Sequence, residues 1–181
     1  MKKNYLFFIA AVLTILLCSY STYSQKNVVL PSNGGLLESF TSEWGAGYEA
    51  SNLTNGITNE DGWASTANPA VPQEFIYSFS GGQEAILVNA VINGGLAEGQ
   101  YYSKDVEVWT SADGTNYTIA ASGVLAQSDN SEITLDLGNT VAEKVKLVIT
   151  SGYRTDYWEL GEFIVNGMVW TIGDSDNDGF S

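Results

Sequence analysis

The chain has no histidine, a single cysteine and only seven basic residues among its 181. Histidine is the usual general base of hydrolases and the commonest protein ligand of zinc, so histidine-based catalysis and zinc chemistry are excluded. The one cysteine, Cys18, lies near the N-terminus, so the chain contains no internal disulfide framework. Rigidity must come from a packed core or from a bound metal ion.

Positively charged residues are also scarce. Acidic residues outnumber basic ones by 21 to seven, for a formal net charge of −14. Nucleic acids and anionic membranes bind positive surfaces, so neither is an expected partner. An excess of carboxylates suits hard, oxygen-ligated cations such as calcium, and it also keeps an extracellular protein soluble.

The first 24 residues predict a secretory signal peptide of bacterial type. Two lysines precede an apolar run at residues 5–17, and the small residue Ser24 precedes the proposed cleavage site. The run is too short for a good membrane span, so no membrane insertion is expected after cleavage. Cys18 offers an alternative as a lipoprotein acylation site, although Leu17 stands where a small residue is usual. We expect a secreted or cell-surface protein.

The segment Asp105–Ala120 is the clearest local prediction in the chain. Apolar residues alternate on both sides of a turn at Asp113-Gly114, with the period of two expected of half-buried strands. Aspartate can bond its own backbone in such a turn, and glycine takes a positive φ without strain. We expect a β-hairpin in which Val106, Val108 and Ile119 point into a core.

Further alternating segments predict an all-β, two-sheet antiparallel β-sandwich of about eight strands. We place strands at residues 73–80, 85–93, 131–137, 144–150 and 157–167, and an opening strand pair between residues 28 and 39. No segment carries a convincing helical pattern. The acids on these strands fall on the polar side of each alternation, so they offer no inward carboxylate pair of the kind glycosidases use. We therefore expect no enzymatic activity.

Three stretches carry a family resemblance. They are the spacing V-x-V-x-x-S-x-D-G-x-x-Y at residues 106–117, GYEASNLTNG at 47–56 with GWAS at 62–65, and YWELGEFIVNG at 157–167. Together they resemble F5/8 type C (discoidin) domains and the related family 32 carbohydrate-binding modules. The resemblance covers residues 27–167 and implies a galactose-binding-like jelly roll.

The resemblance implies a secreted, non-catalytic module that binds neutral glycans and targets an attached domain or a cell surface to them. Two alternatives share the fold. One is an adhesion or protein-interaction domain, and the other is the N-terminal targeting domain of a longer polysaccharide-degrading enzyme. Fold alone does not choose among these functions.

A ligand site is implied in two loops, residues 93–102 and 151–158. A pyranose needs flat apolar surface for its C–H face and fixed polar groups for its hydroxyls. The candidate ligand-binding residues are Asn93, Gln100, Tyr102, Tyr153, Arg154 and Tyr157. Other aromatic residues expected in loops are Trp44, Tyr48, Tyr101 and Trp158. Sugar-binding members often carry a histidine in the first of these loops, and this chain has none.

The resemblance also implies a structural calcium ion that ties the loop after the Asn-Leu-x-Asn-Gly segment to the last strand. The candidate ligands are Asn55, Asn59, Glu60, Asp61 and Glu162, with Asn55 standing where the family usually has aspartate. Calcium takes six to eight oxygens, many of which can be backbone carbonyls.

A second candidate calcium site lies at the C-terminus. The run DSDNDG places Asp174, Asp176 and Asp178 on alternate residues, and it resembles the opening of a thrombospondin type 3 or dockerin-like repeat. The sequence stops at Ser181, before the glutamate that completes such a loop, so a disordered acidic tail is the alternative. We expect a signal peptide at 1–24, a discoidin-like domain at 25–168, a truncated calcium-loop-like tail at 169–181, and further domains beyond it.

Overall fold

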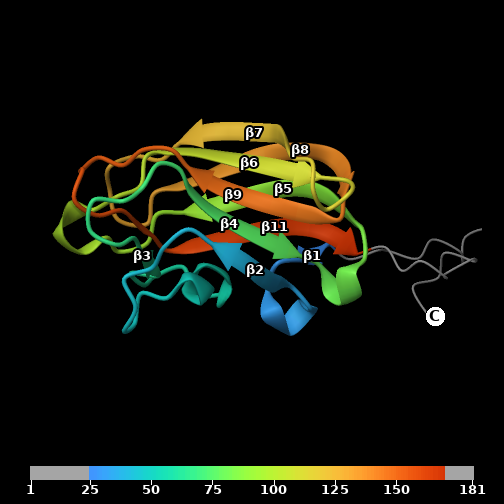
Figure 1. Cartoon of the computed structure of the whole chain (residues 1–181), viewed down its shortest axis with the longest axis horizontal. Helices are drawn as coiled ribbons and strands as arrows, with labels where there is room; N and C mark the ends of the chain where they lie inside the picture. Colours follow the sequence, from blue (N-terminus) through green and yellow to red (C-terminus); the bar gives the residue numbers. More distant parts are fainter. Residues whose placement is uncertain (1–24, 170–181) are drawn as a thin grey trace, which may run out of the picture.

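The computed structural model describes residues 25–169, which form strands joined by turns and longer loops (Figure 1). The strands are β1 (Lys26–Asn27), β2 (Leu36–Phe40), β3 (Trp63–Ala64), β4 (Gln73–Ser78), β5 (Ala85–Asn93), β6 (Asp105–Ser111), β7 (Thr118–Val124), β8 (Glu132–Ala142), β9 (Lys144–Ile149), β10 (Glu159–Leu160) and β11 (Glu162–Val169). The helical pieces are 3₁₀ turns at Pro31–Asn33, Ala50–Thr54, Ser80–Gly82 and Glu98–Gln100. Within this described part, no helix is long and apolar enough to cross a membrane. The predicted signal peptide and acidic tail lie outside the described residues, apart from Val169.

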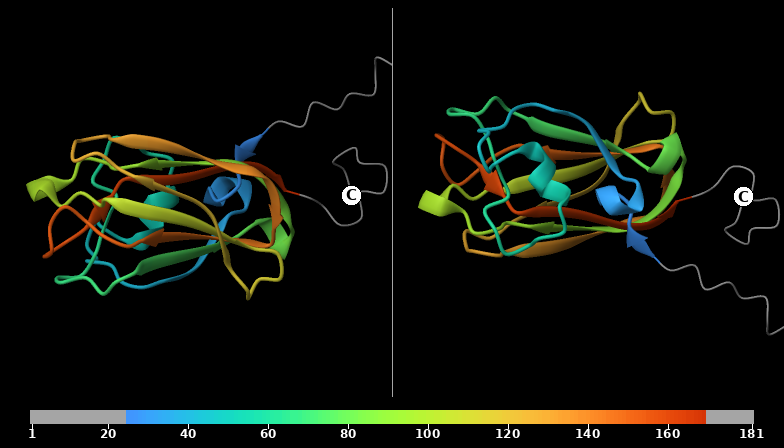
Figure 2. Two further views of the ribbon diagram at one scale, coloured as in Figure 1. Left: turned by 90° about the horizontal axis from the view of Figure 1, so that it is seen from above. Right: turned by 90° about the horizontal axis from the view of Figure 1, so that it is seen from below.

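The strands form two main sheets that face each other, as the views from above and below show (Figure 2). One sheet has the order β1-β11-β5-β8 and the other β2-β4-β9-β6-β7, while β10 and β3 make a separate two-stranded ladder. Every pair within these sheets is antiparallel. The predicted two-sheet antiparallel sandwich is therefore confirmed.

Alternation along each strand decides which side chains fill the space between the sheets. In β4, Phe75 and Tyr77 are fully buried, whereas Glu74 and Ile76 are partly exposed on the outer face. The other largest fully buried side chains are Trp63, Phe79, Phe163, Leu53, Leu87, Ile92, Leu125, Leu147, Ile149 and Leu160. Each buried side chain of this size contributes roughly 1.5–3 kcal/mol, so the core holds the domain together without a disulfide.

The central hairpin forms where the sequence predicts it. The carboxylate of Asp113 accepts hydrogen bonds from the backbone amides of Asn116 (2.7 Å) and Thr115 (2.9 Å) and from the Asn116 side chain, and Gly114 has a φ of +72°. These bonds, the Asn116 side chain first among them, hold the pKa of Asp113 well below its usual value.

The prediction that Ile119 points into the core is wrong, since this side chain is 52% exposed. The register of β6 and β7 shifts between Val108 and Trp109, so Ile119 pairs with Trp109 while Ala121 pairs with Val108. Directly paired residues share a face of the sheet. Trp109 lies on the outer face, and the bulge therefore carries Ile119 out with it.

The predicted opening strand pair is also wrong, because the two strands join different sheets. β1 pairs with β11, and β2 pairs with β4. Val28 and Val29 are fully buried between them, and a 3₁₀ turn that begins at Pro31 reverses the chain. Proline has no backbone N–H for a ladder, which favours a turn at this point. The segment crosses from one layer to the other instead of forming a hairpin.

The ladder of β3 and β10 closes one end of the sandwich. Trp63 is fully buried, packs edge-on against Phe75 with ring centroids 4.8 Å apart, and donates its indole N–H to the carbonyl of Ser42 (2.8 Å). Ala64 pairs with Glu159 across the ladder. The buried Trp63 thus anchors β3 in the core, while Ala64, the next residue of the strand, lies beside the loops.

We predict that Gly62→Ala destabilises the domain much more than Gly138→Ala. Both glycines have positive φ, +67° and +63°, so each substitution costs about 1 kcal/mol in backbone strain. A Cβ at Gly62 would also lie 2.3 Å from the carbonyl oxygen of Leu160, whereas one at Gly138 meets nothing within 4 Å. Overpacking of this kind costs about 1–3 kcal/mol more. Chemical denaturation of both variants measures the difference, and equal losses would contradict the close approach of β3 to β10.

Candidate functional site

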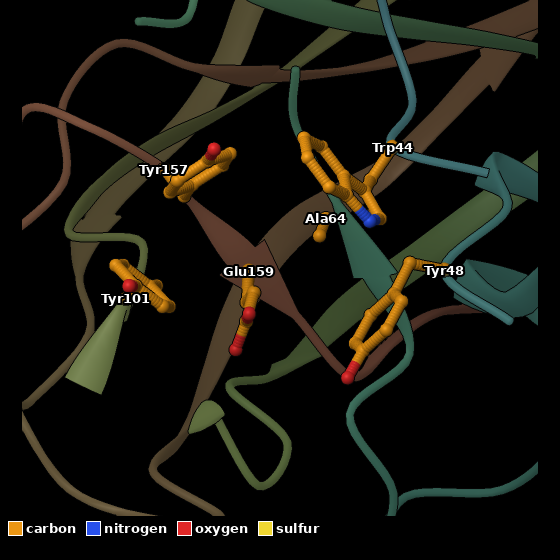
Figure 3. Close-up of a pocket in the computed structure, with 6 residues that line it drawn as sticks. All are labelled: Trp44, Tyr48, Ala64, Tyr101, Tyr157 and Glu159. Carbon is orange, nitrogen blue, oxygen red and sulfur yellow. The ribbon is translucent and has the colours of Figure 1, made fainter. Parts of the chain in front are cut away.

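A pocket of about 250 Å³ opens among the loops at the β3–β10 end of the sandwich (Figure 3). It is lined by Trp44, Tyr48, Ala64, Tyr101, Tyr157 and Glu159. The lining therefore combines four aromatic rings, one small residue and one carboxylate. Pockets for drug-sized ligands span about 300–1,000 Å³, so this one suits a single small ring.

Hydrogen bonds to the short ladder position the aromatic residues. The backbone amide of Trp44 donates to the carbonyl of Ala64 (2.8 Å), and the amide of Ala64 donates to the carbonyl of Tyr48 (3.3 Å). On the opposite side, the amide of Glu159 donates to the carbonyl of Tyr101 (2.8 Å). Since Ala64 and Glu159 are cross-strand partners, three segments distant in sequence are brought to one place.

Tyr157 connects the two aromatic sides of the pocket. Its ring contacts Trp44 and Tyr101 edge-on, with both pairs of centroids 5.2 Å apart. Trp44 is 55% exposed, an unusual degree for a tryptophan. Edge-on ring pairs are worth about 0.5–1.5 kcal/mol each beyond the area that they bury, so these contacts help to hold the three rings as one apolar wall.

Glu159 supplies the carboxyl group of the pocket lining, and its backbone is held by hydrogen bonds on both sides. The residue is only 5% exposed. Besides the bond to Tyr101, its carbonyl accepts hydrogen bonds from the amide (3.1 Å) and the hydroxyl (2.8 Å) of Ser103. These hydrogen bonds fix the backbone of Glu159, and burial restricts the side chain that it carries into the pocket lining.

Arg154 lies beside the pocket on the loop that leads to Tyr157. Its guanidinium makes two hydrogen bonds to Asp156 (2.9 and 2.8 Å) and stacks 4.8 Å from the centroid of the Tyr101 ring. The Asp156 carboxylate raises the pKa of Arg154, and the arginine lowers the pKa of Asp156. The charge of Arg154 is therefore balanced within its own loop.

The sequence-predicted ligand residues fall into two groups. Tyr157 lines the pocket and Arg154 stacks on one of its walls. The other four lie elsewhere: Asn93 is buried and accepts from the Gly95 amide (2.9 Å), Tyr102 is 8% exposed and donates to Asp129 (2.6 Å), Tyr153 donates to the carbonyl of Leu125 (2.8 Å), and Gln100 is exposed in a turn. A role for these four in binding stays a prediction.

Sequence reasoning missed five of the six lining residues as ligand candidates, Ala64 among them. Trp44, Tyr48 and Tyr101 were recognisable only as aromatic residues in loops. Tyr101 and Tyr102 are adjacent, and no sequence signal tells which of them faces the pocket. Glu159 lies one residue after Trp158 in a segment predicted as strand, and nothing in its spacing marks it as a site residue.

The predicted calcium ligand Glu162 has the environment of a group that a cation would stabilise. It is fully buried, its Oε1 accepts from the Gly56 amide (3.0 Å), and its Oε2 has no hydrogen-bond partner among the described residues. Burial, with a further contribution from the charge of Glu60, raises the pKa of Glu162 to about 8. A buried carboxylate with an unmatched oxygen fits one end of a calcium site.

The other predicted calcium ligands fall into two groups, according to whether they lie in the loop that Glu162 contacts. Asn55 donates to Glu60 and accepts from the Ile57 amide (2.7 Å), so both side chains stay in the loop that Glu162 contacts. Asn59 instead accepts from Asn130 (3.0 Å), and Asp61 accepts a long hydrogen bond from Tyr48 (3.5 Å). Asp174, Asp176 and Asp178 lie outside the described residues.

Residues 25–169 contain no group of three or more acidic, histidine or cysteine side chains that could hold a metal ion. A calcium ion at Glu162 would therefore need several backbone carbonyl oxygens in addition to Asn55 and Glu60.

These features define a β-sandwich domain that presents an aromatic pocket on loops at one end, an arrangement typical of binding modules. A family model described as "F5/8 type C domain" matches residues 38–163. The chain therefore belongs to the F5/8 type C domain family, and the resemblance drawn from the sequence is confirmed. No curated protein matches the chain in sequence.

Solved structures share the fold. A CBM32 module from Clostridium perfringens, in complex with GalNAc-β-1,3-galactose, is 24% identical, with a TM-score of 0.63 over 75% of this chain and 97% of that one. The family 32 module of C. perfringens NanJ, in complex with galactose, is 19% identical, with a TM-score of 0.63 over 78% and 98%. Chitosan-binding module 1 from the chitosanase/glucanase of Paenibacillus sp. IK-5 is 22% identical, with a TM-score of 0.60 over 77% and 97%. The galactose-binding-like jelly roll is thus the fold of this chain.

Proposed function

We propose that the domain is a non-catalytic carbohydrate-binding module that holds a sugar ring in the pocket of Trp44, Tyr101, Tyr157 and Glu159. The observation that carries the proposal is the pairing of an aromatic wall with one nearly buried carboxyl group. Aromatic rings offer the flat apolar surface on which the C–H face of a pyranose packs, and a carboxylate accepts hydrogen bonds from its hydroxyls. Tyr48 adds a further hydroxyl to the lining.

The comparisons support this proposal. Two structural neighbours were solved with galactose-containing ligands, and a third is described as chitosan-binding. The overall charge of −14 disfavours anionic glycans, which leaves uncharged or positively charged ones.

The composition of the pocket favours binding over catalysis. Glu159 is the one carboxylate among its lining residues. Glycoside hydrolysis uses two carboxylates that flank the bond to be cleaved. We propose that the domain is secreted and brings an attached domain or a cell surface to its glycan.

We further propose that a structural calcium ion binds at Glu162, with Glu60 and Asn55 as additional ligands. The unmatched Oε2 of Glu162 and the proximity of Glu60 support this, because a cation would offset both the burial and the repulsion of these carboxylates. The ion would fasten the loop around Gly56 to the start of β11, where one hydrogen bond already joins residues 106 positions apart in the sequence.

We predict that Trp44→Ala weakens glycan binding about tenfold, which corresponds to 1.4 kcal/mol. The substitution removes the most exposed aromatic surface of the pocket. Hits from an array of neutral mono- and oligosaccharides, followed by titration calorimetry, measure the effect. Trp109→Ala serves as the matched control, since Trp109 lies on the outer face of β6 with its indole N–H bonded to Glu107 (2.7 Å). A loss of affinity in the control alone, or no response on the array, would favour the adhesion alternative.

We predict that calcium raises the melting temperature of the domain and that a chelator reverses the increase. At a free concentration one hundred times its Kd, a ligand of the folded state adds about 2.7 kcal/mol to the stability. Glu162→Gln should abolish the response, whereas Glu84→Gln, at the far end of β5, should retain it. Identical thermal unfolding of the wild type in calcium and in chelator would contradict the proposal.

A further inference from the structure

We infer that the pocket selects sugars carrying a protonated amine over sugars with a hydroxyl or an N-acetyl group at the same carbon. This inference rests on the proposed function and names the class of glycan. It follows from the sign and placement of the charges at the site together with the aromatic lining.

Glu159 places a nearly buried carboxyl group among the pocket residues (Figure 3). A cation that enters the pocket strongly favours the ionised form of such a group, because little water is present to screen the attraction. A hydroxyl carries no net charge, so its hydrogen bond to the same oxygens lacks the ion–ion attraction that an ammonium group adds.

The other charged groups around the pocket do not reverse its sign. Arg154 is neutralised by two hydrogen bonds to Asp156 and turns its guanidinium onto the Tyr101 ring. Asp61 adds a negative charge near the Tyr48 hydroxyl (3.5 Å). Asp129 adds another beyond the Tyr102 hydroxyl (2.6 Å). The site therefore attracts a positive ligand and repels uronic acids or sialylated glycans.

The aromatic lining strengthens the same preference. An ammonium group within about 6 Å of an aromatic face is attracted to the ring by roughly 0.5–2 kcal/mol. Tyr101 already accepts one cation on its face, as the stacked Arg154 shows. N-acetylation removes the positive charge to which both the carboxylate and the aromatic rings are attracted.

Two ligand series test the inference. The first compares the β-1,4-linked glucosamine disaccharide, its fully N-acetylated form and cellobiose, which differ only at carbon 2. The second compares galactosamine, N-acetylgalactosamine and galactose, with the opposite configuration at carbon 4. Titration calorimetry at about pH 6, where the amine is protonated, should show at least tenfold tighter binding of the amine in the preferred series. This would correspond to 1.4 kcal/mol or more.

Two variants test whether the preference for the amine comes from Glu159. Glu159→Gln should bring the ratio of amine to hydroxyl affinity to within about threefold, whereas Glu84→Gln should leave the ratio unchanged. Circular dichroism and melting curves establish that each variant is folded. If Glu159→Gln does not fold, the wild-type series decides the matter.

The outcomes separate the two proposals. Binding of neutral sugars with no preference for the amine would overturn the inference and leave the proposed function standing. A preference that survives in folded Glu159→Gln would also overturn it. If no sugar of either series or of the neutral array binds, the proposed function fails as well.

Discussion

The cross-strand pairing of Ala64 with Glu159 joins loops that lie far apart in the sequence. Ala64 bonds to the backbones of Trp44 and Tyr48, and Glu159 bonds to those of Tyr101 and Ser103. One cross-strand pair therefore holds the backbones of Trp44, Tyr48 and Tyr101, three of the residues that line the pocket. The ladder itself is anchored because Trp63 and Leu160, the neighbours of this pair, are fully buried in the core.

This construction explains how a domain without disulfides can present a preformed site. The two main sheets supply a rigid core, and the small ladder carries that rigidity to the loops. The edge-on contacts of Tyr157 with Trp44 and Tyr101 then orient the rings relative to one another. At the other side of the ladder, Glu162 ties β11 to the loop around Gly56. Preorganisation of this kind lowers the entropic cost of binding a small ligand.

Much of the fold was predictable because alternation along a strand is a local property. β5 spans the same residues, Ala85–Asn93, that its apolar pattern indicates, and the turn at Asp113 forms by hydrogen bonds within a few residues. Ile119 was placed on the wrong face because β7 has a bulge at Ala120, which reverses the face to which the side chains before it point. A bulge leaves a much weaker signal in a single sequence than a turn does.

The candidate site was predictable only as a region. From the sequence, loop aromatic residues, a surplus of carboxylates and the motifs of the F5/8 type C family indicated a β-sandwich with a ligand site near residues 93–102 and 151–158. The tertiary structure alone decided that Tyr101, and not Tyr102, lines the pocket, and that Glu159 and Trp44 lie beside it. Strand patterns follow from neighbouring residues, whereas these positions depend on hydrogen bonds between segments 16 to 95 residues apart, and no spacing in the chain records which of them meet.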